Sequence, residues 1–316
     1  MVQDPNFVNP LSNPIFIPLI QRFILVFIIG LILILILRKF KIKGIWKSEL
    51  GKRYYSWLII GVIYLTSILV GGYLSLLFLL IVMILAIGEI KKITNLSRTY
   101  TYTLYFLALA SVVVSSFFPQ EFYILPLSYF LILSGFAIIQ NNQKSFQELT
   151  LSLFASIWII FSLSHFVLLG HLNNDIDNTK SLLILVGFAV PFSDIGAYII
   201  GRATSKLSLA KYKIAEKISP KKTYLGVVGD ILGAALAILV MYFIIGNYFT
   251  SWKLISLAIL IGLHSSVGDL TESLFKRYYK TKDSGELIPG HGGVLDRIDS
   301  TLRVIIIVYY FSLIFI

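Results

Sequence analysis

Two aspartates, Asp296 and Asp299, stand three residues apart in the segment LDRIDS near the C-terminus. If a helix starts here, both carboxylates point the same way. Paired carboxylates at a helix start suit a hard divalent cation such as Mg²⁺, whose other ligands are commonly waters and substrate phosphates. Capping and pairing with the helix dipole would explain Asp296 equally well, whereas a metal explains Asp299 better.

A second group of charged residues comes before that pair, in the segment SSVGDLTESLFKR. On a helix, Asp269, Glu272, Ser273 and Lys276 fall at i, i+3, i+4 and i+7, so they share one face. Ionisable groups at the membrane edge of an apolar helix are costly and usually face a cavity or a partner. The simpler alternative is an internal salt bridge between Glu272 and Lys276.

The segment between them, KDSGELIPGHGG, has the glycine and proline content of a shaped loop. Backbone N–H groups beside glycine approach phosphate oxygens closely, and Lys282, His291 and Arg297 would add positive charge. A solvated loop of mixed charge is the alternative. The chain has no GxxxxGK[ST] motif and no GxGxxG motif after a strand, so neither nucleotide-binding fingerprint applies.

Asp194 interrupts an apolar run further upstream, with Tyr198 one turn later. An acid inside a membrane span indicates a functional site by default, and a hydrogen-bonded packing role is its alternative. The basic turn SPKKT, residues 219–223, on its own indicates positive-inside bias or attraction to lipid head groups. His165 and His171 are interpreted as structural, and no paired-histidine arrangement indicates zinc.

Membrane helices must position these residues, because the chain is 57% hydrophobic and only 14% charged. Soluble domains are roughly 25% charged. We therefore predict an all-α, polytopic integral membrane protein of about ten spans, the first of them a retained helix rather than a signal peptide. The predicted spans are 17–37, 55–70, 73–90, 101–118, 122–139, 149–170, 181–200, 225–247, 252–268 and 301–316.

Basic residues alternate between the loops that join these spans. If the loop after the first span is cytoplasmic, every Lys and Arg except Arg22, Lys180 and Lys253 falls on the cytoplasmic side. We expect a multi-pass protein of the cell (inner) membrane with both termini outside. This bias accounts for the net charge of +11, so nucleic-acid binding is not expected. With no cysteine, disulfides and thiol catalysis are excluded.

Residues 1–316 are predicted to form one integral membrane domain. Residues 1–180 carry few polar groups beyond Ser, Thr and Tyr, so we interpret them mainly as scaffold helices. Residues 181–316 form the expected catalytic half, with cytoplasmic loops at 201–224 and 265–300.

Taken together, these residues resemble the phosphatidate cytidylyltransferase family, also called CDP-diacylglycerol synthases. The resemblance is strong over about 187–300, and the first six spans match only in character. The matching positions are Asp194, Ala197, Tyr198, Gly201, Arg202, Lys206, Ser219 to Thr223, Gly226, Gly229, Gly268, Asp269, Ser273, Lys276, Arg277, Lys282, Asp283, Gly285, Pro289, His291, Gly292, Gly293, Asp296, Arg297 and Asp299. The chain departs from the family pattern at Ser205, Leu225 and Asp230, which leaves the lipid preference open.

The resemblance implies that the phosphate of phosphatidic acid attacks the α-phosphorus of CTP, releasing pyrophosphate and leaving CDP-diacylglycerol in the membrane. It implies a homodimer in contact with membrane lipids. It also implies that Mg²⁺ is bound by Asp269, Asp296 and Asp299, and whether a second, monovalent cation is bound stays open. The other residues expected to be catalytic are Lys276, Arg277 and Asp283. Those expected to bind substrate are Asp194, Tyr198, Arg202, Lys221, Lys222, Thr223, Ser273, Lys282, His291, Gly292, Gly293 and Arg297.

Two rival functions stay open at this point. The nearer is cytidylyl transfer to another lipid phosphate, or CTP-dependent phosphorylation of a lipid alcohol. The more distant is a transporter, which ten spans with buried charge would suit. Transporters favour inverted repeats and sites at the membrane midplane, whereas no repeat is apparent here and the acids cluster near one end of the spans.

Overall fold

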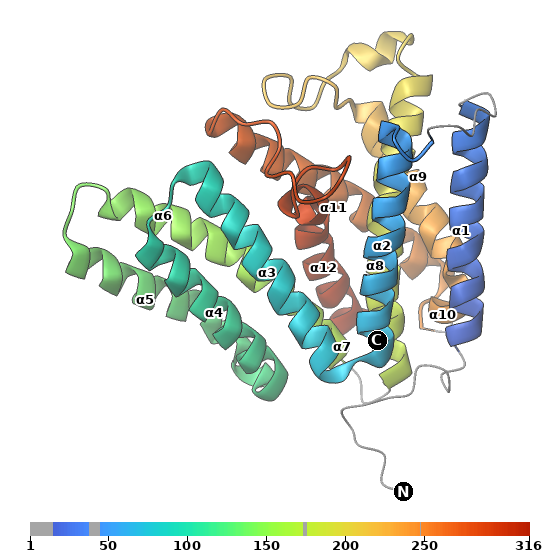
Figure 1. Ribbon diagram of the computed structural model, residues 1–316. Helices are drawn as coiled ribbons and strands as arrows, with labels where there is room; N and C mark the ends of the chain where they lie inside the picture. Colours follow the sequence, from blue (N-terminus) through green and yellow to red (C-terminus); the bar gives the residue numbers. More distant parts are fainter. Residues whose placement is uncertain (1–14, 38–44, 173–175, 247) are drawn as a thin grey trace, which may run out of the picture.

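The computed structural model describes residues 15–37, 45–172, 176–246 and 248–316, and all the longer elements in these ranges are helices (Figure 1). Nine candidate spans of the described chain are long and apolar enough to cross a membrane. The prediction of an all-α polytopic membrane protein is confirmed. The basic residues Arg38, Lys39, Lys41 and Lys43, used above for the orientation, lie outside the described residues, as does Asn247.

The helices occur in the order of the predicted spans, and two of these spans are interrupted. The span Ser145–Gly170 contains a π-helical turn, Ser156–Phe161, and the predicted span 225–247 breaks at Met241 into a 17-residue helix and a single short turn. The helices are α1 (Phe16–Leu37), α2 (Glu49–Val70), α3 (Gly72–Thr94), α4 (Arg98–Phe117), α5 (Leu125–Gln140), α6 (Ser145–Ala155), α7 (Ser162–Gly170), α8 (Ile176–Ala203), α9 (Tyr224–Val240), α10 (Tyr242–Ile245), α11 (Ser251–Tyr278) and α12 (Leu295–Phe315).

Several helices extend beyond the apolar runs that predicted them. Helix α11 continues to Tyr278, ten residues past the predicted end of its span, and α12 begins at Leu295, six residues before its predicted start. Hydropathy marks only the part of a helix that suits hydrocarbon, so it misses charged helix ends. Because α11 and α12 are longer than predicted, the charged residues of DLTESLFKR and LDRIDS lie on helices. The shared helix face inferred from their spacing depends on this.

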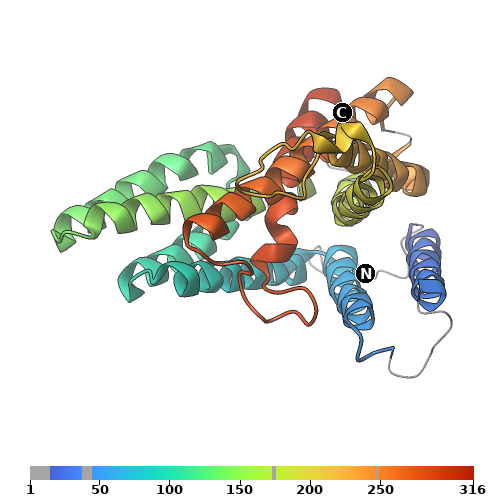
Figure 2. The same ribbon diagram turned by 90° about the horizontal axis from the view of Figure 1, so that it is seen from above.

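The molecule has two groups of helices with α11 and α12 between them (Figures 1 and 2). Helices α4, α5 and α6 lie together on one side, joined to the rest by α3, while α8, α9 and α10 lie on the other. Helix α12 packs against both α11 and α7. The starts of α2, α9 and α12 and the ends of α3, α8 and α11 all point to the same end of the bundle (Figure 1).

Glycines allow unusually close packing in the second group. A Cβ atom at Gly196 of α8 would overlap the carbonyl oxygen of Gly229 on α9, and one at Gly233 would overlap the Phe192 carbonyl. Helix α11 approaches α12 in the same way, because a Cβ at Gly268 would lie 2.6 Å from the Ser300 Cα. Small residues that let helix backbones meet are the usual means of packing helices in membranes.

We expect Gly233→Ala to lower the stability of the folded protein by about 1–3 kcal/mol, because the added methyl group meets backbone atoms that cannot move aside. The melting temperature of the purified protein in detergent would measure this. Gly135→Ala on α5 is the matched control, since a Cβ there meets no atom within 4 Å, and alanine is the better helix former. Equal melting temperatures for the two variants would contradict close α8–α9 packing.

Candidate active site

Three carboxylates from α11 and α12 converge near the end of the bundle. Asp269, Glu272 and Asp299 each offer an oxygen, and these oxygens lie within 4.8 Å of one another. Glu272 is 1% exposed, and its Oε1 has no hydrogen-bond partner in the described part of the chain. A buried carboxylate oxygen without a donor is unfavourable. Together with the oxygen-only donor set, it fits a hard divalent cation.

Asp296, the third predicted metal ligand, is bonded to other protein groups instead. Its Oδ1 accepts a hydrogen bond from Lys276 Nζ at 2.6 Å. Its Oδ2 accepts from the backbone N–H groups of Ser284 at 2.9 Å and Gly293 at 2.7 Å, and from Ser284 Oγ at 2.9 Å. Asp296 is thus held by Lys276 and by the loop before α12, whereas Glu272 lies beside Asp269 and Asp299.

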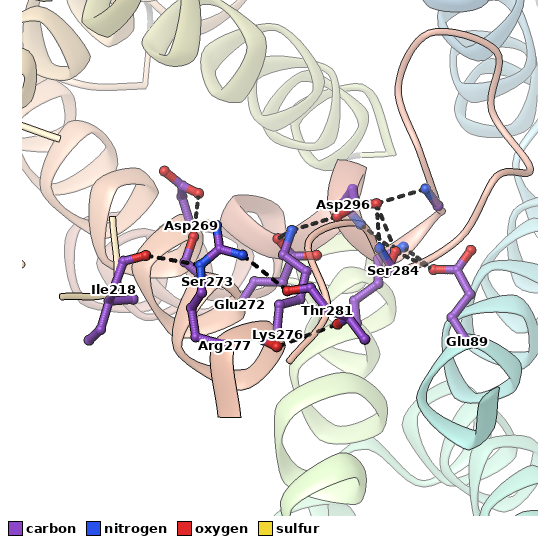
Figure 3. Close-up of polar contacts among 12 residues, drawn as sticks. Glu89, Ile218, Asp269, Glu272, Ser273, Lys276, Arg277, Thr281, Ser284 and Asp296 are labelled. Carbon is purple, nitrogen blue, oxygen red and sulfur yellow. Dashed lines mark hydrogen bonds and ion pairs between the residues drawn. The ribbon is translucent and has the colours of Figure 1, made fainter. Parts of the chain in front are cut away.

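Lys276 lies between two buried carboxylates (Figure 3). Its Nζ donates to Glu272 Oε2 at 2.5 Å as well as to Asp296. The salt bridge named above as an alternative is therefore present, but Glu272 also belongs to the carboxylate cluster, so the two interpretations hold together. Lys276 is itself buried, and it ties α11 to the first turn of α12.

The SPKKT turn meets the carboxylate cluster through Lys222. The Lys222 Nζ donates to Asp269 Oδ2 at 2.8 Å and to the Ser266 carbonyl oxygen at 3.0 Å. Thr223 is the N-cap of α9, and its side chain accepts from the Gly226 N–H at 3.0 Å. Capping fixes where the turn ends, and this places Lys222 against α11.

Two further acids lie on the neighbouring helices. Asp230 of α9 is buried, and its carboxylate accepts hydrogen bonds from the hydroxyls of Ser193 and Ser266. Asp194 of α8 is exposed, and the Ser265 hydroxyl donates to it at 3.5 Å. The structure therefore brings both acids to α11, where Asp269 also lies.

Several predicted site residues lie outside the buried cluster. Arg277 donates to the carbonyl oxygens of Ile218 at 3.4 Å and Thr281 at 3.0 Å, and Arg202 donates to the Tyr198 hydroxyl at 2.8 Å. Ser273 donates to Asp269 at 3.5 Å (Figure 3). The side chains of Tyr198, Arg202, Lys221, Arg277, Lys282 and Asp283 are exposed. An open cleft beside the SPKKT turn is lined by Lys206, Lys211, Lys213, Lys221 and Thr223.

His291 docks the α11–α12 loop onto α2. Its Nε2 lies 3.2 Å from the Arg53 carbonyl oxygen, and its ring meets the edge of Trp57 at 5.7 Å between centroids. Burial, and next the neighbouring charge of Arg297, lowers the pKa of His291 to about 4. His291 is then neutral near pH 7 and does not supply the positive charge that we expected of it.

The lowered pKa predicts how loop docking depends on pH. The unfolded chain binds a proton at His291 near pH 6.5, and the folded chain only near pH 4, so this residue's contribution to stability is complete above pH 6.5 and declines as pH falls toward 4. We expect His291→Asn to show a smaller loss of melting temperature between these pH values than the wild type. His171→Asn, which removes an exposed histidine at the end of α7, is the control. Parallel pH curves for wild type and His291→Asn would contradict the expectation.

Glu89 of α3 belongs to the site and was missed by the sequence analysis. Its carboxylate accepts hydrogen bonds from the backbone N–H groups of Val294 at 2.7 Å and Leu295 at 2.8 Å, and from Ser284 Oγ at 2.8 Å. The expectation that residues 1–180 are scaffold with few polar groups overlooks it. The signal was available, since Glu89 is an acid inside an apolar span, the criterion that identified Asp194.

Glu89 also explains two of the loop glycines. A Cβ at Gly285 would lie 2.9 Å from Glu89 Oε1, and a Cβ at Gly293 would overlap Glu89 Oε2. The N–H of Gly293 already donates to Asp296. The close approach that glycine permits here therefore serves two protein carboxylates, whereas the glycine-rich pattern had suggested contact with a phosphate. Gly292, with φ of 87°, has the left-handed backbone that favours glycine.

Comparisons with known proteins give a matching family and several similar proteins. A family model described as "Cytidylyltransferase family" matches residues 51–315. A protein of Staphylococcus haemolyticus (strain JCSC1435) named phosphatidate cytidylyltransferase is 30% identical over 257 residues, which cover 77% of this chain and 91% of that protein. The protein of the same name from Staphylococcus aureus (strain COL) is 27% identical over 257 residues, covering 77% and 92%. That from Staphylococcus saprophyticus (strain ATCC 15305) is 41% identical over a shorter stretch of 123 residues.

Proposed function

The chain belongs to the cytidylyltransferase family, and from this we propose that it is an enzyme that transfers the cytidylyl group of CTP to phosphatidic acid. A phosphate oxygen of phosphatidic acid forms a bond to the α-phosphorus of CTP. The bond from that phosphorus to the oxygen bridging to the β-phosphorus breaks, and pyrophosphate leaves with the electron pair. The products are CDP-diacylglycerol, a precursor in phospholipid synthesis, and pyrophosphate.

The observation that carries this proposal is the cluster of Asp269, Glu272 and Asp299 beside basic side chains. Both reactants are polyanions, so the site must neutralise charge and hold the two phosphates in line. We propose that these three carboxylates hold Mg²⁺, which when bound neutralises charge on the phosphates. Glu272 Oε1 has no hydrogen-bond partner among the described residues, and a bound cation would satisfy it.

The basic residues that would receive phosphate lie on the SPKKT side of the cluster. Lys222 reaches Asp269 from this turn, and the adjoining cleft is lined by four lysines. We propose that this cleft holds the polyphosphate of CTP, with Lys221 and Lys222 nearest to the reacting phosphate. Lys276, by contrast, is paired with both Glu272 and Asp296, so its proposed role is to position those acids.

The orientation is part of the proposal. CTP is a cytosolic metabolite, so the end of the bundle that carries the carboxylate cluster faces the cytoplasm. Both termini then lie on the outer side of the cell membrane. Because the chain has no cysteine, single cysteines report sidedness cleanly. Lys217→Cys should react with an impermeant maleimide only from the cytoplasmic side, and Ser251→Cys only from outside. The reverse pattern would overturn the orientation.

The proposed homodimer is tested by the mass of the purified protein from light scattering in detergent.

An assay with purified protein, labelled CTP and Mg²⁺ tests the reaction itself. Phosphatidic acid, an ether-linked glycerol phosphate lipid and a lipid alcohol are offered in parallel. A cytidine-containing lipid formed together with pyrophosphate supports the proposal, and the best substrate identifies the lipid class. A phosphorylated lipid formed together with CDP would instead support the CTP-dependent kinase and overturn it.

A further inference from the structure

Helix α12 has no capping side chain of its own. Its N-cap residue is Val294, which makes no side-chain cap bond. The first N–H groups of any helix lack partners within the helix and must be satisfied from elsewhere. Asp296, the one acid in the first turn of α12, is bonded to Lys276 and to the preceding loop. The α12 start therefore depends on a group supplied by another helix.

Glu89 supplies that group from α3. It is 6% exposed, and its two oxygens accept from Val294 N–H and Leu295 N–H, the cap residue and the first residue of α12. An anion at a helix start is favoured twice, by the free N–H groups and by the helix dipole. Gly285 and Gly293 leave the space that the carboxylate occupies.

The same carboxylate is linked to the candidate active site by a continuous chain of contacts (Figure 3). Ser284 Oγ lies 2.8 Å from Glu89 Oε2 and 2.9 Å from Asp296 Oδ2, so it bridges the two acids. Asp296 holds Lys276, and Lys276 holds Glu272. Each of these groups is buried. A displacement at Glu89 would therefore be transmitted to Glu272 and, through the first turn of α12, to Asp299.

We propose that Glu89 is a positioning residue for the reaction. It touches no substrate. Its carboxylate caps α12 in place of a local side chain and, through Ser284, Asp296 and Lys276, holds the Asp269–Glu272–Asp299 cluster in shape. This inference rests on the proposed function for its kinetic readout, but the shape of the cluster is measurable without turnover.

The central experiment compares wild type with Glu89→Gln, which keeps the size of the side chain but turns one acceptor into an NH₂ group facing backbone N–H groups. We expect kcat to fall about 10–100-fold, as for other residues that orient ligands, with KM for CTP within about threefold. Mn²⁺ binding in the absence of CTP, followed by electron paramagnetic resonance, is expected to weaken by about tenfold. Glu89→Asp retains the charge and should recover part of both losses.

Glu148→Gln is the matched control. Glu148 of α6 also accepts a backbone N–H from another element, that of Ser97 at 3.0 Å, where α4 starts. Within the described residues its hydrogen bond leads to α4 and not to the carboxylate cluster, so kcat and Mn²⁺ affinity are expected to stay within about twofold of wild type. A loss equal to that of Glu89→Gln would show a general effect on folding, and it would overturn the proposal.

A double-mutant cycle adds a second, independent test. The methyl group of Gly293→Ala would displace the Ser284 hydroxyl and the Glu89 carboxylate that it binds. Because both variants break the same contact, the loss of kcat in the double variant should be no larger than in the worse single variant. Additive losses in the double variant would overturn the proposal. So would wild-type kcat and Mn²⁺ affinity in Glu89→Gln.

If Glu89→Gln does not elute as a folded species, Glu89→Asp and Gly293→Ala decide in its place. A wild-type protein that forms no CDP-lipid would defeat the proposed function, yet the Mn²⁺ comparison would still test Glu89.

Discussion

The Asp299→Asn variant is expected to form CDP-diacylglycerol at less than about a thousandth of the wild-type rate. Asp299 is mostly buried, and it is the one member of the carboxylate cluster that comes from α12. An amide keeps the shape of the side chain but removes the negative charge that a hard cation prefers. The measurement is labelled CDP-lipid formed by purified protein in detergent micelles, at saturating CTP and Mg²⁺.

Two comparisons make the Asp299 result specific. The melting temperature of Asp299→Asn should stay close to that of wild type or rise, because burying a neutral amide is easier than burying a charge. Glu286→Gln removes an exposed acid from the α11–α12 loop and should retain normal turnover. Near-normal turnover by Asp299→Asn would remove Asp299 from the metal site.

The Lys276→Met variant is expected to lose about 3–5 kcal/mol of stability, together with its activity. Removing one partner of a buried ion pair leaves a buried charge without compensation, and here a single lysine compensates two acids at 2.5 Å and 2.6 Å. Methionine has a similar length and no charge, so the lost interaction is mainly electrostatic. Thermal unfolding in detergent measures the loss of stability.

Lys280→Met provides the control for Lys276→Met. Lys280 follows the same helix end, but its side chain is exposed, and surface charges of this kind contribute little to stability. We expect its melting temperature and turnover to match those of wild type. If Lys276→Met also melted like wild type, Glu272 and Asp296 would not need a cation between them, and the link from Glu89 to the carboxylate cluster would be broken at that point.

The fold was largely predictable because long apolar runs and the alternation of basic loops are local properties of the chain. The shared face of Asp269, Glu272 and Lys276 was predictable for the same reason, since helical periodicity acts over a few residues. Helix ends were not, because α11 and α12 extend into polar sequence that hydropathy does not count. The interruption of the helix at Met241 could not be predicted, because neither Met241 nor its immediate neighbours are proline or glycine.

The partners of the site residues were harder to predict, because they depend on which helices become neighbours. Lys222 and Asp269 lie 47 positions apart, and Glu89 and Val294 lie 205 positions apart. No periodicity spans such separations. The spacing of Asp296 and Asp299 showed that both would share a face if the helix began there, but it could not show that Lys276 and two backbone N–H groups engage Asp296.

The separation between Glu89 and α12 has a consequence for how the protein is made. Chains are synthesised from the N-terminus, so α3 is inserted long before Val294 and Leu295 exist. Until the last helix arrives, the Glu89 carboxyl group lies at the edge of a membrane helix without the donors that later satisfy it, which is unfavourable. A nascent chain that ends before residue 294 is therefore incomplete in its first half as well as its last, and we expect cellular proteases to remove such fragments faster than the full-length protein.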